Sequence, residues 1–499
     1  MLVIVSDLHF TDGSSGSTLS PGALPIFAQR LKELAVAASW RSDGSYRPIE
    51  RMDIVLLGDV LDVIRSARWL SVPNVRPWVN PHAPQFVDQI TRITGDILNY
   101  NEEALAVLRG LASQGQITVP PAIRTGRPAA DIHGQPVPVQ IHYMVGNHDW
   151  IFHLSGAKFD QLRQMAVRQM GLANRHTQPF PHDISENEEL LQTMRRHKVA
   201  ARHGDLFDPL CFDGDRDASS LGDAVVIELV SRFAAEVAGR LGSELPASTL
   251  LGLQEIDNVR PLLLIPVWIY GLLERTCPSP SLRKRVKTVW DQLTDEFLSL
   301  DFVRQRDGGS PLDLIDGLDR ALKFSKRLSI GWASSIAGWL NRIRGSSSDS
   351  YCHHALAEPD FRNRRAKHLV YGHTHVAESV PLDASYAEGY VLNQMYFNSG
   401  TWRRVHRQTQ LAPGQHEFIA SDVMSYLVFY QGDERKGRPY ETWSGTLGFN
   451  TAEVTIHRID PGRSSHAPGQ SVSTSSVHEH APHFPAPAAK PGVSTPRRI

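Results

Sequence analysis

Five short polar signatures recur along the chain, each at the end of a short apolar run. They read, in order, Ser6-Asp7-Leu8-His9, Gly58-Asp59-Val60-Leu61-Asp62, Gly146-Asn147-His148-Asp149, His203-Gly204-Asp205 and Gly372-His373-Thr374-His375. Imidazole nitrogens combined with carboxylate oxygens suit Mn, Fe, Zn, Ni or Co better than Ca. The signatures therefore predict a site for transition-metal ions, with Mn foremost among them.

Two of the signatures place a pair of ligand-type residues two positions apart. Asp7 and His9 form one pair, and His373 and His375 form the other. Side chains two residues apart in an extended backbone point to the same side, so each pair can converge on one ion. The other candidate ligands, which complete a donor set large enough for two ions, are Asp59, Asn147 and His203.

A pair of ions suits the hydrolysis of phosphoesters. Two ions about 3.5–4 Å apart stabilise the attacking and leaving oxygens of an in-line displacement, and they lower the pKa of bound water toward about 7, which provides hydroxide at neutral pH. Asp59 can bridge such ions. We expect His148 to act as the general acid, with Asp62 as the carboxylate that orients it. Asp149 and Asp205 are expected to accept hydrogen bonds from ligand imidazoles.

The apolar runs before the signatures predict the strands that position them. These runs are Leu2–Val5, Ile54–Leu57, Val139–Val145, Val199–Ala201 and His368–Tyr371. Helical patterns lie between them at Ala23–Ala38, Phe86–Leu111 and Phe159–Met170. Strands alternating with helices predict an α/β layered domain, in which ligands bind at the carboxyl ends of the strands.

In the second half of the chain, the predicted secondary structure and the composition change twice. Residues 206–365 are mostly helical in pattern, with helices predicted at Leu221–Leu241, Leu282–Leu300 and Leu312–Leu328. We interpret them as an insertion that could form a cap. Strand-like segments then follow at Gly389–Phe397, Met424–Tyr430 and Ala452–Ile456 and predict a second sheet. Residues 460–499 are dominated by Pro, Ser, His and Ala, which predicts a disordered tail.

Taken together and in this order, the signatures resemble those of the calcineurin-like metallophosphoesterase superfamily, namely DxH, GDxxD, GNHD/E, a lone His and GHxH. The resemblance covers 1–205 and 366–459 as the catalytic domain and implies two mixed β-sheets in a sandwich flanked by helices. It implies ligands for a first ion at Asp7, His9, Asp59 and His375, and for a second at Asp59, Asn147, His203 and His373. His148 would be the proton donor, paired with Asp62.

The substrate is less constrained. Residues 203–208 resemble the HGDxxD segment of UDP-diacylglucosamine pyrophosphatases, although those proteins are much shorter and carry Arg where this chain has His148. We therefore expect a phosphodiester or a nucleotide-linked pyrophosphate. The alternatives are a nuclease of the same superfamily, or a binding or scaffold protein without turnover. Lys plus Arg number 52 against 53 for Asp plus Glu, so no net positive charge indicates a nucleic-acid partner.

The remaining features bear on cellular context. Cys211, Cys277 and Cys352 are far apart, which predicts reduced thiols rather than disulfides. The apolar run at the N-terminus is too short for a signal peptide, so we expect a cytoplasmic protein. Residues 320–344 hold six Lys or Arg, no acidic residue and two Trp, a pattern that predicts either peripheral contact with an anionic membrane or a cap helix packed on its neighbour.

Overall fold

Two mixed β-sheets and several groups of helices form a layered α/β fold, as predicted. The computed structural model describes residues 1–16, 19–20, 22–72, 74–129, 134–260, 262–306, 322, 350–387, 390–412 and 415–446. The predicted tail at 460–499, the strand Ala452–Ile456, the helix Leu312–Leu328 and the basic segment 320–344, except Leu322, lie outside the described residues. The described residues belong to one unit, Met1–Gly448.

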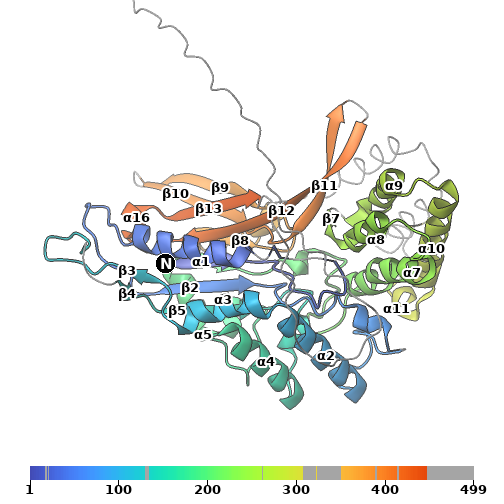
Figure 1. The fold of residues 1–499 in the computed structure, drawn as a ribbon. Helices are drawn as coiled ribbons and strands as arrows, with labels where there is room; N and C mark the ends of the chain where they lie inside the picture. Colours follow the sequence, from blue (N-terminus) through green and yellow to red (C-terminus); the bar gives the residue numbers. More distant parts are fainter. Residues whose placement is uncertain are drawn as a thin grey trace, which may run out of the picture. The chain divides into compact units, whose positions relative to one another are not determined.

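The larger sheet carries three of the signatures at one edge (Figure 1). Its strand order is β5-β2-β1-β12-β11-β7, with β13 also paired to β12. The strands are β1 Leu2–Val5, β2 Met52–Leu57, β5 Val139–Met144, β7 Val259–Arg260, β11 Arg404–Ala412, β12 Gln415–Phe429 and β13 Tyr440–Thr446. Because β1, β2 and β5 are parallel, their carboxyl ends meet at the same edge.

The smaller sheet carries the other two signatures. Its order is β6-β8-β10-β9, with β6 Val199–Ala201, β8 His368–Tyr371, β9 Glu378–Ala387 and β10 Tyr390–Asn398. Strands β6, β8 and β10 are parallel, and β9 is antiparallel to β10. A separate pair of short strands, β3 Thr118–Val119 and β4 Gln135–Pro136, joins neither sheet.

The alternation of side chains along β1 explains why its whole sequence is apolar. Leu2 and Ile4 face the core between the two sheets, where they meet Phe397 and Phe429. The residues between them, Val3 and Val5, face the helices instead. A strand that is buried on both faces has no polar side to its pattern, so β1 reads as a continuous apolar run.

Four helices cover the outer face of the larger sheet and share a core with it. They are α1 Ala23–Ala38, α2 Pro84–Tyr100, α3 Glu102–Ser113 and α4 Ala157–Met170. The predicted helical stretch Phe86–Leu111 is two helices rather than one. It divides at Asn101, whose side-chain amide donates to the carbonyl of Ile97, at 2.7 Å, and to that of Thr11, at 2.8 Å. These bonds end α2 and tie it to the segment after β1.

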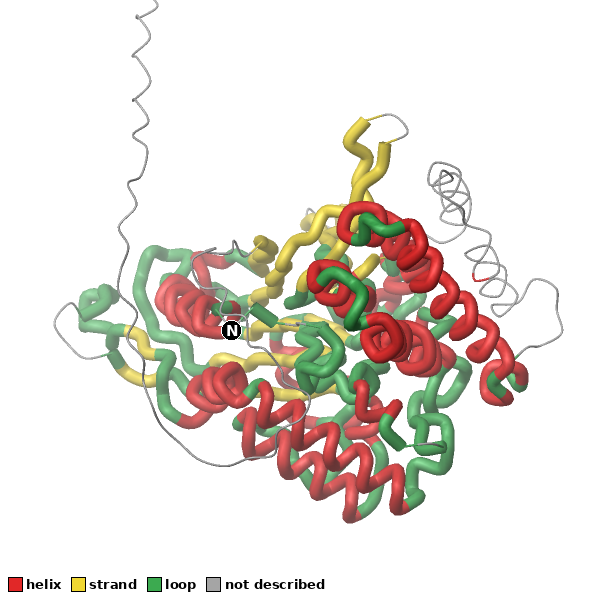
Figure 2. The backbone as a smooth tube through the Cα atoms, turned by 45° about the vertical axis from the view of Figure 1, so that its right-hand side comes forward, coloured by secondary structure: helices red, strands yellow, loops and turns green. Residues whose placement is uncertain are grey.

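The insertion has a hydrophobic core of its own. Its described helices are α6 Leu221–Ala224, a π-helical stretch Val225–Ser231, α7 Arg232–Leu241, α8 Ala247–Gln254, α9 Ile265–Thr276, α10 Pro280–Ser299 and α11 Asp301–Arg304. Phe233 and Val237 of α7 pack with Trp268 and Trp290 in this core. Figure 2 shows these helices in red beside the yellow strands of the β11–β12 hairpin.

A short strand attaches the insertion to the larger sheet. Val259 and Arg260 form β7, which pairs in parallel with β11, with Val259 opposite His406 and Arg260 opposite Arg407. The sequence did not predict this strand, because two residues carry no periodicity. The insertion is therefore joined to the larger sheet through backbone hydrogen bonds.

The remaining helices are short. They are α5 Glu188–Arg196, α14 Cys352–Ala355, α15 Pro359–Arg362 and α16 Glu434–Gly437, together with the 3-10 helices, of which Trp150–His153, Ile184–Glu186 and Asp205–Phe207 flank the site described below. Within the part of the chain that the structure describes, no helix has both the length and the apolar character to cross a bilayer.

A buried histidine makes the fold sensitive to acid. His368 at the start of β8 is 5% exposed, with its ring centroid 5.0 Å from that of Phe429 and 5.5 Å from that of Tyr440. Burial, followed by the charge of Lys367, lowers the pKa of His368 to about 4.

We predict that His368→Phe will make the protein less sensitive to acid. The folded-state pKa lies below the unfolded value of 6.5, so this group leaves stability unchanged above pH 6.5 and lowers it as pH falls toward 4, by up to about 3 kcal/mol. Chemical unfolding midpoints measured from pH 7.5 to 4.5 should fall less steeply for His368→Phe than for the wild type. Parallel curves for the two proteins would contradict this assignment.

Candidate dinuclear metal site

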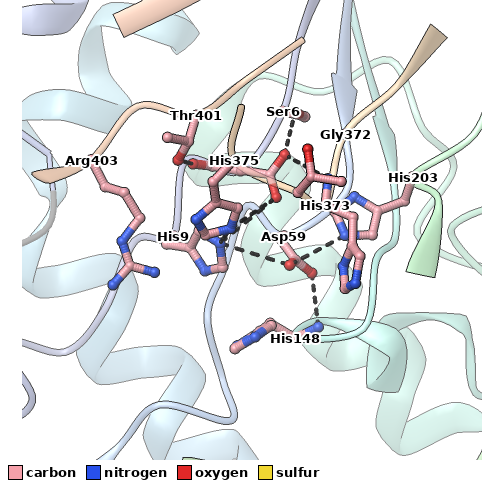
Figure 3. A network of polar contacts seen from close by, with 12 residues as sticks. Ser6, His9, Asp59, His148, His203, Gly372, His373, His375, Thr401 and Arg403 are labelled. Atoms are coloured by element: carbon pink, nitrogen blue, oxygen red, sulfur yellow. Dashed lines mark hydrogen bonds and ion pairs between the residues drawn. The ribbon is translucent and has the colours of Figure 1, made fainter. Parts of the chain in front are cut away.

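The five signatures meet where the two sheets present their carboxyl ends. Figure 3 shows His9, Asp59 and His148 from the larger sheet facing His203 and His373 from the smaller one. The segments that follow β1, β2, β5, β6 and β8 bring together all seven candidate ligands, namely Asp7, His9, Asp59, Asn147, His203, His373 and His375. These side chains lie far apart in the sequence and are neighbours in space.

The first ligand group contains Asp7, His9, Asp59 and His375, whose donor atoms lie within 4.8 Å of one another. His375 Nε2 lies 3.2 Å from Asp7 Oδ1 and 3.0 Å from His9 Nε2. His9 Nε2 lies 3.7 Å from Asp59 Oδ2. This is the set that the family resemblance implies for the first ion.

The second ligand group contains Asp59, His203 and His373. His203 Nε2 lies 3.2 Å from Asp59 Oδ2 and 3.3 Å from the amide oxygen of Asn147. The carboxylate of Asp59 thus approaches a histidine of each group through the same oxygen. This position is the one that a bridging ligand requires.

The donor set fits divalent transition-metal ions. Asp7 Oδ1 is buried and has no hydrogen-bond partner among the described residues. Burial raises the pKa of Asp7 to about 6, since an isolated carboxylate is costly to keep charged away from water. A cation would satisfy that oxygen, and imidazole with carboxylate is a ligand mixture that Mn, Fe, Co, Ni and Zn accept.

Hydrogen bonds on the outer side of two imidazoles fix which nitrogen faces the ligand groups. His9 Nδ1 lies 2.7 Å from Asp62 Oδ2, which leaves Nε2 toward Asp7 and His375. His203 Nδ1 lies 2.9 Å from the carbonyl oxygen of Leu57, which leaves Nε2 toward Asp59. Metal-binding histidines are commonly oriented in this way.

The ligand residues adopt a backbone conformation that non-glycine residues rarely take. Five of them have positive φ: Asp7 at 54°, His9 at 45°, Asp59 at 52°, His373 at 67° and His375 at 60°. This left-handed region costs about 1–3 kcal/mol for a residue other than glycine, and such strain is concentrated at functional sites. The sharp turns at the strand ends are what aim these side chains inward.

Glycines of the signatures leave room for the ligands. A Cβ atom at Gly146 would meet Asp59 Oδ1 and would lie 2.6 Å from His203 Cδ2. At Gly372 it would lie 2.7 Å from Asp7 Oδ2. These distances are shorter than any Cβ contact in real proteins, so the glycines are required by close approach.

His148 and Asp62 form the pair that the sequence predicted. His148 Nδ1 lies 2.7 Å from Asp62 Oδ1, and the backbone N–H of His148 donates to Asp59 Oδ1 at 2.8 Å. Burial alone would lower the pKa of His148, but the charges of Asp62 and Asp59 outweigh it and raise the pKa to about 10. The side chain is 13% exposed, so it can reach a bound molecule.

Asp62 has a second role that the sequence did not reveal. One carboxylate oxygen accepts from His148 and the other from His9, while the backbone N–H of Arg65 donates to Oδ1 at 3.1 Å. Asp62 therefore positions a candidate ligand and the candidate acid together. A single carboxylate couples the orientation of both rings.

The prediction for Asp149 and Asp205 was wrong. Asp149 accepts from the backbone N–H groups of Val60, at 2.8 Å, and Gly146, at 2.6 Å, and from the hydroxyl of Tyr143. It thereby fixes two signature loops rather than an imidazole. Asp205 accepts from Arg216 at 2.9 Å. Neither carboxylate has a hydrogen bond to a ligand imidazole among the contacts of the described residues.

Asp208 is a residue that the sequence analysis did not select. Its Oδ2 lies 3.1 Å from His373 Nε2, which leaves Nδ1 of that ring for an ion. The signal was present, because Asp208 ends the segment 203–208 that resembles an HGDxxD motif. The spacing from His203 alone does not show which of the two aspartates meets a ligand.

A buried charge cluster lies behind the site and includes a residue of the insertion. Asp257 Oδ2 lies 2.7 Å from Arg65 Nε and 3.2 Å from Arg403 Nη2, and all three side chains are buried. Figure 3 shows Arg403 beside His9, on the side away from His203. Two guanidinium groups thus share one carboxylate next to the ligands.

Residues at and just after the end of β10 support the first and fifth signatures. Thr401 Oγ1 donates to the carbonyl of Asp7 at 2.8 Å, and Asn398 Nδ2 donates to the carbonyl of Gly372 at 2.7 Å. The sequence analysis missed them, although Asn398-Ser399-Gly400 is another polar exit from an apolar strand. The ligands were identified as polar residues directly after an apolar strand. The same criterion would have selected this segment too.

Comparisons with known proteins identify no relative of this chain. No model of a known protein family matches the chain, and no curated protein matches it.

We predict that Gly146→Ala will weaken binding of divalent ions, because the added methyl group displaces Asp59 or His203. Mn²⁺ bound per chain, measured by mass spectrometry after equilibrium dialysis, should fall well below that of the wild type. Gly239→Ala is the matched control, since a Cβ at this position of α7 meets nothing within 4 Å. Equal Mn²⁺ content in both variants would show that Gly146 is not needed for the ligand geometry.

Proposed function

We propose that this chain is a metal-dependent phosphoester hydrolase of the calcineurin-like metallophosphoesterase superfamily. The observation that carries the proposal is the pair of ligand groups that share Asp59, with the His148–Asp62 pair beside them. The order of the signatures along the chain and their place at the strand ends support the same reading. Two bound ions would supply Lewis acidity toward phosphoryl oxygens and would lower the pKa of water.

The residues of the chain divide the remaining work between them. The seven candidate ligands would hold two ions, with Asp59 shared by the two groups. Asp62 orients His148 by accepting a hydrogen bond at Nδ1, so Nε2 is the nitrogen that can give a proton to the leaving oxygen. The charge of Asp62 also favours the protonated form of this ring and raises its pKa. A positioned acid of this kind contributes about 10²–10⁴-fold to rate.

We propose an anionic substrate, either a phosphodiester or a nucleotide-linked pyrophosphate. Arg65 and Arg403 support this choice, since their two guanidinium groups meet at Asp257 beside the ligands. Positive potential in a largely buried site favours anions and raises their local concentration. The near-neutral charge of the whole chain shows that this attraction is local.

The test is hydrolysis by protein that has been stripped of metal and reloaded with Mn²⁺. We predict turnover of bis(p-nitrophenyl) phosphate that requires metal and falls at least about 10²-fold in Asp59→Asn, because one negative charge shared by both ligand groups is lost. For His148→Ala the loss should be small with p-nitrophenyl leaving groups and about 10²–10⁴-fold with an alkyl leaving group, which needs protonation.

A matched variant controls for general damage. His82 is exposed and packs its ring on Phe159, away from the ligands, so His82→Ala should retain wild-type rates. Bound Mn²⁺ without turnover of any mono- or diester would overturn the hydrolase proposal and favour a binding or scaffold protein. Turnover of DNA or RNA in preference to small diesters would favour a nuclease.

A further inference from the structure

A second cluster of ligand-type side chains lies outside the candidate dinuclear site. It contains His153, His182 and Asp217, and one donor atom of each lies within 4.8 Å of the others. His153 ends the 3-10 helix Trp150–His153, and His182 lies just before the 3-10 helix Ile184–Glu186. Asp217 belongs to the insertion. Three separate segments of the chain thus converge on one point.

The three donor atoms converge on a carboxylate oxygen. Asp217 Oδ1 lies 2.6 Å from His153 Nδ1 and 3.4 Å from His182 Nε2. The centroids of the two imidazole rings are 4.3 Å apart. Two ring nitrogens that face one oxygen can be joined either by a proton or by a cation. The geometry alone allows an ion to take ligands from all three residues.

Glu186 supplies the outer support that metal-binding histidines usually have. Its Oε2 lies 3.4 Å from His153 Nε2 and accepts from the backbone N–H of His182 at 2.9 Å. A carboxylate at Nε2 would keep that nitrogen protonated when an ion replaces the proton that Nδ1 shares with Asp217. Glu186 therefore orients one ligand and anchors the segment of the other.

The exposure of the three residues gives an ion a route of entry. The side chain of His182 is 3% exposed, that of His153 is 23% exposed and that of Asp217 is 43% exposed. The buried imidazole fixes the inner side of the cluster, while the carboxylate faces solvent. A site with three protein ligands leaves a position for water, as tetrahedral zinc sites often do.

We propose that His153, His182 and Asp217 bind a third divalent ion of the zinc class. Two imidazoles and one carboxylate favour Zn²⁺, or a similar transition metal, over Mg²⁺ and Ca²⁺. The ion would join the insertion, through Asp217, to His153, which lies five residues after His148. Bound there, the ion would hold the start of the insertion against the loop that carries the candidate acid.

The test is the number of ions bound per chain by the full-length protein, measured by mass spectrometry after dialysis against Zn²⁺ at a buffered free concentration. We expect Asp217→Asn and His182→Ala to bind one ion fewer than the wild type, whatever the total. The difference is independent of the dinuclear proposal, because loss of those two ions would lower every count equally. His82→Ala is the control and should match the wild type.

Two further measurements keep the proposal falsifiable if His182→Ala folds poorly. Asp217 is partly exposed, so Asp217→Asn should keep the wild-type circular dichroism spectrum. Glu186→Gln should bind the ion with about 10–100-fold lower affinity while keeping the full count at saturating Zn²⁺. Equal ion counts in the wild type, Asp217→Asn and His182→Ala would overturn the proposal and show that His153 and Asp217 form an ion pair without metal.

Discussion

The contact of Asp59 with the histidines of both ligand groups is the interaction on which the site depends. Asp59 comes from the larger sheet and His203 from the smaller one, so this contact connects the two halves of the sandwich. The other carboxylate oxygen accepts from the backbone of His148. The charge of His203, then that of His148, outweighs burial and keeps the pKa of Asp59 below its usual range. Both ligand groups contain this buried carboxylate.

The strain at the ligands shows what the rest of the fold must supply. Left-handed backbone at five ligand residues is unfavourable at each position. It persists because the strands just before them are almost entirely buried and cannot shift. Close packing in such a core transmits any displacement to its neighbours. The rigidity of β1, β2 and β8 therefore holds the ligands in a geometry that their own backbone preferences oppose.

The sequence predicted the strands that carry ligands much better than those that do not. Strands β1, β6 and β8 were predicted residue for residue, because burial on both faces leaves a continuous apolar run. Strand β11 was missed, since its sequence alternates with Arg, His and Gln and lacks that run. Some buried polar residues near the site, such as Asp257, come from other segments, and no sequence pattern around them predicts their position. Their neighbours are set by tertiary pairing, as between β7 and β11.

The order of the strands along the chain also governs when the sandwich can close during synthesis. Strand β1 pairs with β2, which follows early, and with β12, which ends at Phe429. At about 5–20 residues per second, a ribosome needs roughly 20–90 s to reach that residue. Until then Leu2 and Ile4 lack their neighbours on β12, Phe429 and Leu427. The nascent chain therefore carries an apolar strand, β1, without its second neighbour in the sheet for tens of seconds.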